Sequence, residues 1–564
     1  MKPFVVAPSR VDDPFHFFAH LRTIARGRAI LESLGPFDAS TARYSVVGAL
    51  PVQELRHEGS RAWLVDDGDR RRVEVDWLRV LDDWCPVGPL GAPDPVQTGA
   101  IGYVGYDANP ARETRTSRHV NEPSVPAVRL VRYGAVLVFD RATARATWAY
   151  EPALEDEVAA LERRWDAWRD REPPAAPFRV HGDLRPDISL DELMERVART
   201  VEYIRAGDIF QANITARFSA GYDGDLFGAY AGMRETTPNP FFAYLDFDPP
   251  LLSTSPERFF QVAGGHAHSR PIKGTAPIEV DGVDQRAPLL ARPKDRAENV
   301  MIVDVVRNDL GRVCRRGSVQ VDSLCEAKRF NHLYHLESTV SGELEDGVSA
   351  SRILGALFPP ASITGAPKLR AIEVIDELEP VRRGPYCGAI GFFGSDGWID
   401  TSVAIRVVYA SAGRIYAHAG GGIVVDSLPE TERGELLLKL EALRRPLDAF
   451  NVLAEPRAAI DAVDDRLLAL LAERFAIVSE IAELKRKHGI PTLQPSRVEA
   501  MKTARERQAA ELGTIPSGLV GELFDLLVRY AMIVEADAWE DAREGRARAR
   551  SGHVGARLSG RGVP

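Results

Sequence analysis

The chain has 564 residues, 45% of them hydrophobic and 27% charged, and its formal net charge is −10 at pH 7. At roughly 100–200 residues per domain, this length predicts several domains with the composition of an ordinary globular protein. The acidic balance argues against a nucleic-acid binder and against a membrane-surface binder, because both favour a basic face.

The four cysteines lie far apart and form no CxxC pair, which argues against a zinc site or a disulfide framework. This cysteine usage fits a reducing cytoplasm. No apolar run reaches the roughly 20 residues that span a bilayer. The start of the chain, "MKPFVVAPSR", lacks the long apolar segment of a secretion signal. We therefore expect a cytoplasmic protein without a membrane partner.

The first 170 residues contain short runs rich in Val, Tyr and Ile between glycines and prolines: "RYSVVGALP", "TGAIGYVGYD" and "RLVRYGAVLVFD". Such runs predict strands. The Pro-rich polar segment 171–187 predicts a connection across the surface. Ser189 is the expected N-cap of a helix, because acidic residues and apolar residues at helical spacing follow it. Strands and helices then alternate to about residue 450.

Residues 457–487 have a different pattern, with no Gly or Pro before Gly489. Apolar residues recur there at steps of three and four, which predicts a helix of roughly 45 Å at about 1.5 Å per residue. Such a long amphipathic helix predicts packing against a partner chain. The Arg- and Gly-rich tail, residues 543–564, has almost no apolar content and is expected to be disordered.

Two short stretches of the large region place reactive side chains close together in sequence. In "RPIKGT", Lys273 stands between an apolar residue and a glycine, so it is either a surface charge on a turn or a nucleophile held in a site. In "SPERFF", Glu257 follows a turn-forming Ser-Pro just before that stretch. A folding argument alone does not require either side chain.

Two predicted helices offer carboxylates. Asp295 and Glu298 lie near the start of a helix, where acidic residues also suit the helix dipole. In "ETERGELLLKLEAL", Glu432, Glu435 and Lys439 share one helix face, which is also typical of a solvated charge stripe. Carboxylates from two helices are what Mg²⁺ needs, since it takes a few oxygen ligands and keeps waters.

Two glycine-containing stretches offer backbone amides for an anion. In "AGGGIV" the amides of Gly421 and Gly422 are open to close approach, although a plain turn has the same composition. In "ASITGAPKLRAIEVIDELEP", Thr364 and Gly365 precede a helix that has a proline near its start, which is a second possible anion site.

Taken together, these stretches resemble the chorismate-utilising enzymes, specifically the synthase component of aminodeoxychorismate synthase and its sister, anthranilate synthase component I. The resemblance covers roughly residues 1–448 and is carried by these ordered blocks: "GDIFQANI", "SPERF", "PIKGT", "KDRAENVMIVDVVRNDLGR", "ITGAPKLRAIEVIDELEP", "YCGAIGFF", "AGGGIV" and "ERGELLLK". It implies a large α/β domain of two stacked antiparallel sheets with helices outside and a site in the cleft between them.

The resemblance also implies roles for these residues. Anthranilate synthases resemble P-I-A-G-T at the "PIKGT" block, whereas the aminodeoxychorismate enzymes carry Lys as here, so Lys273 aligns with a nucleophile that attacks chorismate at C2. Glu257 aligns with the general acid for the departing hydroxyl. The remaining implied roles are ring contact for His335; Mg²⁺ binding for Glu298 and Glu435, with Asp295 and Glu432 in or near the outer shell; and substrate binding for Thr364, Gly365, Tyr386, Arg406, Gly421, Gly422 and Lys439.

Gln211 departs from the isochorismate and salicylate branches, which place a water-activating lysine there, so those branches are disfavoured. No cysteine has the Gly-x-Cys-x-Gly setting of a glutaminase nucleophile. The resemblance therefore implies a separate glutamine amidotransferase subunit that supplies ammonia. "ILES" (30–33) and "NPFFAY" (239–244) resemble the family's tryptophan-binding region, although apolar core packing would produce the same residues.

Residues 452–540 resemble the all-helical, AroQ-class chorismate mutases, which are intertwined dimers. Arg457, Arg474, Lys485 and Arg497 fall on the family's cationic positions, which would surround a dianion during a pericyclic rearrangement. Surface cations on an amphipathic helix are the alternative. The expected domains are a synthase domain in two parts (1–175 and 176–450), a mutase-type helical domain (451–542) and the basic tail (543–564).

Three positions of this helical region depart from the family: Gln494 replaces Asp, Val498 replaces Glu, and Glu535 replaces Gln. A mutase adapted to a 4-amino substrate would fit these changes, although an ammonium should prefer Asp over Gln. We expect a bifunctional enzyme that makes 4-amino-4-deoxychorismate and rearranges it to 4-amino-4-deoxyprephenate. The alternatives are a folate-pathway synthase with an attached chorismate mutase, and a synthase with a catalytically silent dimerisation or regulatory module.

Overall fold

A computed structural model describes residues 4–59, 61–66, 68–73, 76–87, 92–108, 110, 117, 119, 122–174, 176–280, 282–330, 333–516 and 518–543. The chain divides into two compact units, Met1–Val452 and Leu453–Pro564. None of the described helices is both long enough and apolar enough to cross a membrane. The four cysteines are buried and unbridged.

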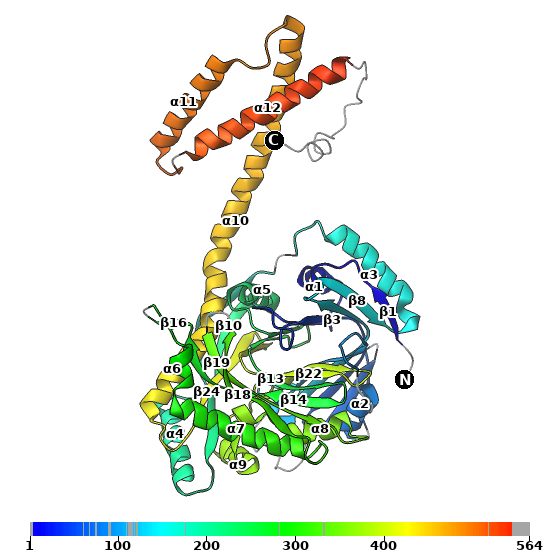
Figure 1. Cartoon of the computed structure of the whole chain (residues 1–564), viewed down its shortest axis with the longest axis vertical. Coiled ribbons are helices and arrows are strands. Elements are labelled where there is room, and N and C mark those ends of the chain that lie inside the picture. Colours follow the sequence, from blue (N-terminus) through cyan, green and yellow to red (C-terminus); the bar gives the residue numbers. More distant parts are fainter. Residues whose placement is uncertain are drawn as a thin grey trace. The chain divides into compact units, whose positions relative to one another are not determined.

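The first unit mixes strands and helices (Figure 1). Its strands are β1 (Val5–Pro8), β2 (Ala29–Glu32), β3 (Tyr44–Glu58), β4 (Arg61–Asp66), β5 (Asp69–Arg72), β6 (Gly99–Val104), β7 (Val128–Asp140), β8 (Arg145–Tyr150), β9 (Phe178–Pro186), β10 (Gln211–Gly224), β11 (Phe241–Leu245), β12 (Leu251–Ser255), β13 (Arg258–Ala263), β14 (His266–Arg270), β15 (Ile272–Pro277), β16 (Glu279–Val280), β17 (Val283–Asp284), β18 (Gln320–Phe330), β19 (Leu333–Glu343), β20 (Gly365–Ala366), β21 (Ala389–Gly394), β22 (Ile399–Val403), β23 (Val407–Ser411) and β24 (Arg414–Ile423).

The α-helices that begin in this unit are α1 (Pro14–Leu21), α2 (Trp77–Trp84), α3 (Glu155–Trp168), α4 (Leu190–Arg205), α5 (Leu226–Thr236), α6 (Arg286–Leu290), α7 (Pro293–Gly311), α8 (Ala350–Leu357), α9 (Lys368–Leu378) and α10 (Pro429–His488). Short 3₁₀ turns are η1 (Tyr106–Ala108), η2 (Pro152–Leu154) and η3 (Ala361–Ile363). The predicted N-cap is confirmed: Ser189 and Glu192 form a reciprocal capping box at the start of α4.

Alternation along the strands explains the layered arrangement. Neighbouring residues of one strand point to opposite faces, and here they enter different cores. On β11, Phe242 packs into a core that includes α1, α4, α5 and α9, whereas Ala243 packs into a central core. On β21, Phe392 enters the same central core, whereas Phe393 faces a third core that includes α2, α7 and α8. The central core therefore lies between two sheet layers.

The predicted α/β fold with two stacked antiparallel layers and helices outside is confirmed, with one addition. The layers are joined by hydrogen bonds, because all the described strands except the β16–β17 hairpin belong to one continuous pairing network. The long strands β3 and β7 pair with each other through several register shifts. Both strands contribute residues to all three cores, so they bend from one layer into the other.

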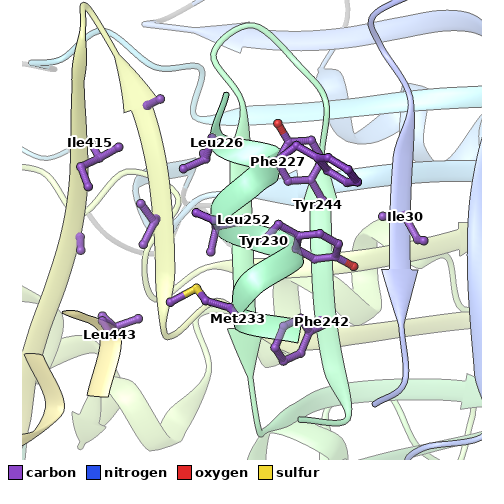
Figure 2. Packing of buried hydrophobic residues seen from close by; sticks show 14 of the residues in the cluster. Ile30, Leu226, Phe227, Tyr230, Met233, Phe242, Tyr244, Leu252, Ile415 and Leu443 are labelled. Carbon is purple, nitrogen blue, oxygen red and sulfur yellow. The ribbon is translucent and has the colours of Figure 1, made fainter. Parts of the chain in front are cut away.

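The helix-covered outer face of one layer is shown in Figure 2. Leu226, Phe227, Tyr230 and Met233 of α5 pack on β11 and β12, and Leu443 of α10 belongs to the same core. This packing anchors the first part of α10 beside β24. On the other layer, α7 packs against β15, β18 and β19. These two helices are the ones expected to carry acidic ligands.

The second unit consists of the remainder of α10 with α11 (Pro495–Leu512) and α12 (Leu519–Arg543), the last two packed side by side (Figure 1). The sequence predicts a helix over residues 457–487. The structure instead has one helix from Pro429 to His488 that continues through Pro446 and Pro456. A proline removes one hydrogen bond and favours a break, but strong helix formers flank both prolines, and the helix does not end there.

Candidate active site

Lys273 lies on β15 at a bulge. The pairing with β19 shifts between Lys273 and Thr275. Gly274 takes a φ of 82°, a left-handed conformation that favours glycine. A Cβ at Gly274 would lie only 3.0 Å from the Asp295 Cβ on α7. The bulge therefore brings this part of β15 into close contact with the start of α7.

The Lys273 amine has charged neighbours of both signs. Burial lowers the pKa of Lys273 below its usual value, and the Lys439 ammonium lowers it further. Three carboxylates oppose this effect, namely Glu298, Glu257 and Glu435. Because the net pKa shift is downward, a larger fraction of this amine is unprotonated near neutral pH than for an exposed lysine. The unprotonated amine is the nucleophilic form.

Glu257 follows β12 and is 4% exposed. Burial raises the pKa of Glu257 to about 7, and this outweighs the opposite effects of the Ser362 hydroxyl and the Lys273 charge. The Ile272 amide donates to Glu257 Oε1 at 3.4 Å, which ties the carboxyl to the residue before Lys273. A carboxyl with this pKa is a competent proton donor near neutral pH.

Glycines at the end of β24 leave its backbone open. A Cβ at Gly422 would lie 2.5 Å from Gln211 Nε2 and 3.3 Å from Lys273 Nζ. A Cβ at Gly421 would lie 3.2 Å from Glu432 Oε2. Larger residues would fill the space between the strand and these polar groups. The absence of side chains here lets an anion approach the backbone amides.

The charged face of α10 points at this glycine strand. Lys439 Nζ donates to the Gly420 carbonyl at 2.9 Å and lies 2.7 Å from Glu435 Oε1. Glu432 is only 5% exposed. The expectation of one shared helix face is confirmed, and that face lies against β24. Glu432 is buried there, whereas Lys439 and Glu435 keep about half of their side-chain surface exposed, at 47% and 50%.

Glu298 and Glu435 come from different helices and influence each other's charge. Burial raises the pKa of Glu298, and the negative charges of Asp295 and Glu435 contribute to that rise. Partial burial of Glu435 acts to raise its pKa, but the charge of the Lys439 ammonium and its hydrogen bond outweigh this effect, so the net shift of the Glu435 pKa is downward. Within the part of the chain that the structure describes, no three His, Cys, Asp or Glu side chains are grouped closely enough to hold a metal ion by themselves.

The donor set still fits Mg²⁺, which is commonly held by one or two carboxylates together with substrate oxygens and waters. Glu298 and Glu435 are two such carboxylates, and their mutual repulsion is what a bound cation relieves. Asp295 lies against Gly274 at the start of α7, and Glu432 lies against Gly421, so both flank the pair.

His335 and Arg406 form a second polar group of the site. His335 Nδ1 lies 2.9 Å from Thr275 Oγ1. Burial, together with the nearby Arg406 cation, lowers the pKa of His335 to about 3. The imidazole is therefore neutral and acts as a hydrogen-bonding group rather than as a cation. Arg406 has a φ of 52°, an uncommon backbone conformation of the kind that collects at functional sites.

Gln211, Thr364 and Gly365 meet where β10 pairs with β20. Gln211 is fully buried, yet neither its side-chain oxygen nor its nitrogen has a partner among the described residues. Unpaired buried amides are costly, so this one is suited to a bound ligand. The Thr364 hydroxyl donates to the Pro360 carbonyl at 2.8 Å, which leaves its oxygen able to accept.

Tyr386 is buried and stacks on His418, with ring centroids 4.8 Å apart. Burial raises the pKa of Tyr386 well above its usual value, so the phenol stays neutral. His418 Nε2 is buried without a partner in the described structure. His418 lies four residues before Gly422 on β24. Sequence reasoning missed it, because a lone histidine in a strand carries no pattern.

A separate cavity of about 250 Å³ lies between the two segments that resemble a tryptophan-binding region. Its walls include Leu31, Glu32 and Ser33 from "ILES" and Phe241 and Phe242 from "NPFFAY". Core packing alone does not account for the residues of these two segments, because they also line this cavity.

The described cations of the second unit differ in how they are paired. Lys485 Nζ donates to both oxygens of Glu535 at 3.0 Å and to the Thr492 carbonyl at 2.7 Å. Arg474 Nη1 is buried and has no partner among the described residues. Gln494 and Arg497 are exposed at the start of α11. The Arg457 side chain lies outside the described residues.

An amine with a lowered pKa, a carboxyl with a pKa of about 7, an open glycine backbone and carboxylates from two helices are a combination that suits an enzyme site for a small anionic substrate. The family model for chorismate binding enzymes matches residues 36–445, and the model for chorismate mutase type II matches residues 456–535. The chain belongs to the chorismate binding enzyme family, and its C-terminal region carries a domain of the chorismate mutase type.

Curated relatives cover most of the chain. Aminodeoxychorismate synthase component 1 of Salmonella typhimurium is 35% identical over 459 residues, which are 79% of this chain and 99% of the relative. Anthranilate synthase component 1 of Streptomyces coelicolor is 35% identical over 76% of this chain and 85% of its own. The crystal structure of anthranilate synthase component I from Streptococcus pneumoniae TIGR4 superposes with a TM-score of 0.61 at 29% identity, covering 72% of this chain and 93% of that one.

Proposed function

We propose that this chain is the synthase component of an aminodeoxychorismate synthase and aminates chorismate at C4. The observation that carries the proposal is Lys273, whose Nζ lies beside the open Gly422 backbone and has a lowered pKa. The relatives named aminodeoxychorismate synthase component 1 support the same substrate and reaction.

In the proposed mechanism, the unprotonated Lys273 amine attacks C2 of the chorismate ring as the C4–O bond breaks. Glu257 gives its proton to the departing hydroxyl, which leaves as water. Ammonia then attacks C4 and the bond between C2 and Lys273 breaks, which regenerates the amine. One difficult substitution is thereby divided into two allylic ones. Lys439, Arg406 and the Gly421 and Gly422 amides bind the substrate carboxylates.

Glu298 and Glu435 would hold Mg²⁺, with Asp295 and Glu432 nearby. When bound, the cation would neutralise and orient a substrate carboxylate. We expect Glu298→Gln or Glu435→Gln to weaken Mg²⁺ binding and to raise the KM for chorismate together, by about tenfold or more. Titration calorimetry with Mg²⁺ and a steady-state amination assay measure the two effects. Activity that persists in excess chelator would show that these carboxylates serve another purpose.

The pKa of Glu257 predicts a pH dependence with a definite sign. Because the acid form donates the proton and the pKa is about 7, kcat/KM for amination should fall about tenfold per pH unit above that value. The profile is measured at constant free ammonia, so that nitrogen supply does not change. In Glu257→Gln this alkaline limb should be missing and the rate low throughout. If the fall in kcat/KM above pH 7 is unchanged in Glu257→Gln, then another group causes that fall.

A glutamine amidotransferase subunit is the proposed ammonia donor, because the relatives are named as component 1 of their synthases.

Homodimerisation through the C-terminal helices is also proposed. In the single chain, the second part of α10 exposes several apolar side chains: Ile460, Val463, Leu467, Leu468, Leu470, Ile477, Ile481 and Leu484. Sedimentation of the full chain should give a dimer, and Leu467→Glu with Leu470→Glu should give a monomer.

For the second unit we propose rearrangement of 4-amino-4-deoxychorismate to 4-amino-4-deoxyprephenate. Arg474, Lys485 and Arg497 would bind the two carboxylates. Glu535, paired with Lys485, replaces the usual glutamine and reduces the positive charge beside the ether oxygen. The alternatives remain a chorismate mutase attached to a folate-pathway synthase, and a silent dimerisation or effector module.

The deciding experiment is mass spectrometry of the products that the full chain forms from chorismate, Mg²⁺ and ammonium. 4-Amino-4-deoxychorismate, converted in turn to its prephenate analogue, supports the whole proposal. Separately supplied chorismate and 4-amino-4-deoxychorismate then give kcat/KM for each rearrangement. A higher value for chorismate favours the attached chorismate mutase, and no rearrangement of either compound favours the silent module.

A further inference from the structure

A buried ion pair lies next to the site, and the Tyr386 amide donates to the carbonyl of its arginine, Arg383, at 3.2 Å. Arg383 is 1% exposed and Glu379 is 4% exposed. Arg383 Nε and Nη2 donate to the two carboxylate oxygens of Glu379 at 2.8 and 2.7 Å. A buried pair of this kind is weak evidence for stability, because well-packed apolar residues often do as well. Its other contacts indicate what it does.

The pair joins three segments that are far apart in the sequence. Arg383 Nη1 donates to the Ile363 carbonyl at 3.0 Å, and Nη2 donates to the Asn213 carbonyl at 2.5 Å. Glu379 Oε1 accepts from both the amide and the hydroxyl of Thr215, at 2.8 and 2.9 Å. The end of α9, the η3 turn and β10 are therefore held by one network of charge-assisted hydrogen bonds.

Each of these segments carries or supports a substrate-facing group. Asn213 and Thr215 pair directly with Gly422 and Gly420 on β24. The Asn213 amide also donates to the Thr364 carbonyl at 2.8 Å. The ion pair is thus one strand away from the glycine backbone on one side and one residue away from Thr364 on the other.

We infer that Arg383 and Glu379 are positioning residues that hold the Gly420–Gly422 backbone and the Thr364 turn in the geometry that binds a substrate carboxylate. This inference rests on the proposed function for what the glycine backbone binds. Neither side chain contacts the reacting atoms. Backbone amides bind the same carboxylate before and during the reaction. Displacing these amides therefore weakens binding of the substrate and of the transition state by similar amounts. Such a change raises KM and leaves kcat nearly unchanged.

The test compares Arg383→Lys with a matched control, Arg129→Lys, in the full chain. Arg129 is also a buried arginine: its Nε donates to Glu54 at 2.6 Å, and its guanidinium lies 4.7 Å from the centre of the Phe247 ring. Arg383 likewise pairs with a glutamate, and its guanidinium lies 4.6 Å from the centre of the Tyr106 ring. Both variants should lose comparable thermal stability. Only Arg383→Lys should raise the KM for chorismate, by about tenfold, with kcat within about threefold.

Thr215→Val removes one hydroxyl from the network and nearly conserves volume, so it decides the matter if Arg383→Lys does not fold. We expect it to raise the KM for chorismate about threefold. The inference is overturned if KM is unchanged in every folded variant of this network, or if Arg129→Lys raises KM equally. Failure of the wild-type chain to aminate chorismate would instead overturn the proposed function, so the two failures are distinguishable.

Discussion

Lys273→Ala is expected to lower C4 amination by about a thousandfold or more, equivalent to ~4 kcal/mol of barrier. Alanine has no nucleophile, so the covalent route through C2 is closed. The space left beside Gly422 and Gln211 is then open to ammonia at C2, and anthranilate-type product should appear. Liquid chromatography with mass spectrometry of the reaction with ammonium separates the two products.

The same chain supplies the control for this experiment. Rearrangement activity in the second unit should be unchanged in Lys273→Ala, which shows that the protein is folded and dimeric. Lys328→Ala is the matched substitution, since the Lys328 side chain is 40% exposed on β18 and forms a surface ion pair with Glu326 at 3.0 Å. Full C4 amination by Lys273→Ala would overturn the assignment of this lysine as the nucleophile.

Arg474→Ala is expected to lower the rearrangement by about a hundredfold to a thousandfold, the usual cost of removing a donor that stabilises developing charge. Arg474 Nη1 is buried without a partner among the described residues, whereas the three donors of Lys485 are taken up by Glu535 and Thr492. Arg474 is therefore the more available cation for a substrate carboxylate. The rate is measured with 4-amino-4-deoxychorismate supplied directly.

Amination by Arg474→Ala should match the wild-type chain, because the two reactions use different units. Arg486→Ala is the matched control, as this arginine is exposed on the same helix. An equal loss of rearrangement activity in both variants would show that any substitution on this helix impairs the reaction. Full rearrangement activity in both variants would overturn the assignment of Arg474 as the catalytic cation. The ratio of rearrangement to amination in one sample removes errors in protein concentration.

Much of the local structure could be predicted from residues near each other in the chain. The strands around "RYSVVGALP" and "RLVRYGAVLVFD", the N-cap at Ser189 and helix α7 all depend on short-range patterns, and all were confirmed. The end of the predicted 457–487 helix was also correct within a residue. Its start was wrong, because helix continuation through Pro446 and Pro456 depends on the context on both sides.

The sequence by itself determined which ionisable groups are present and their order along the chain: a lysine in the "PIKGT" block, two helices with acidic residues, a glycine-rich strand and a C-terminal region of the mutase type. Only the tertiary structure decided their chemical state. The raised pKa of Glu257 and the lowered pKa of Lys273 are caused by burial. The link between Arg383, Asn213 and Ile363 joins residues up to 170 positions apart. Burial and long-range contacts follow from packing of the whole unit, which no local pattern encodes.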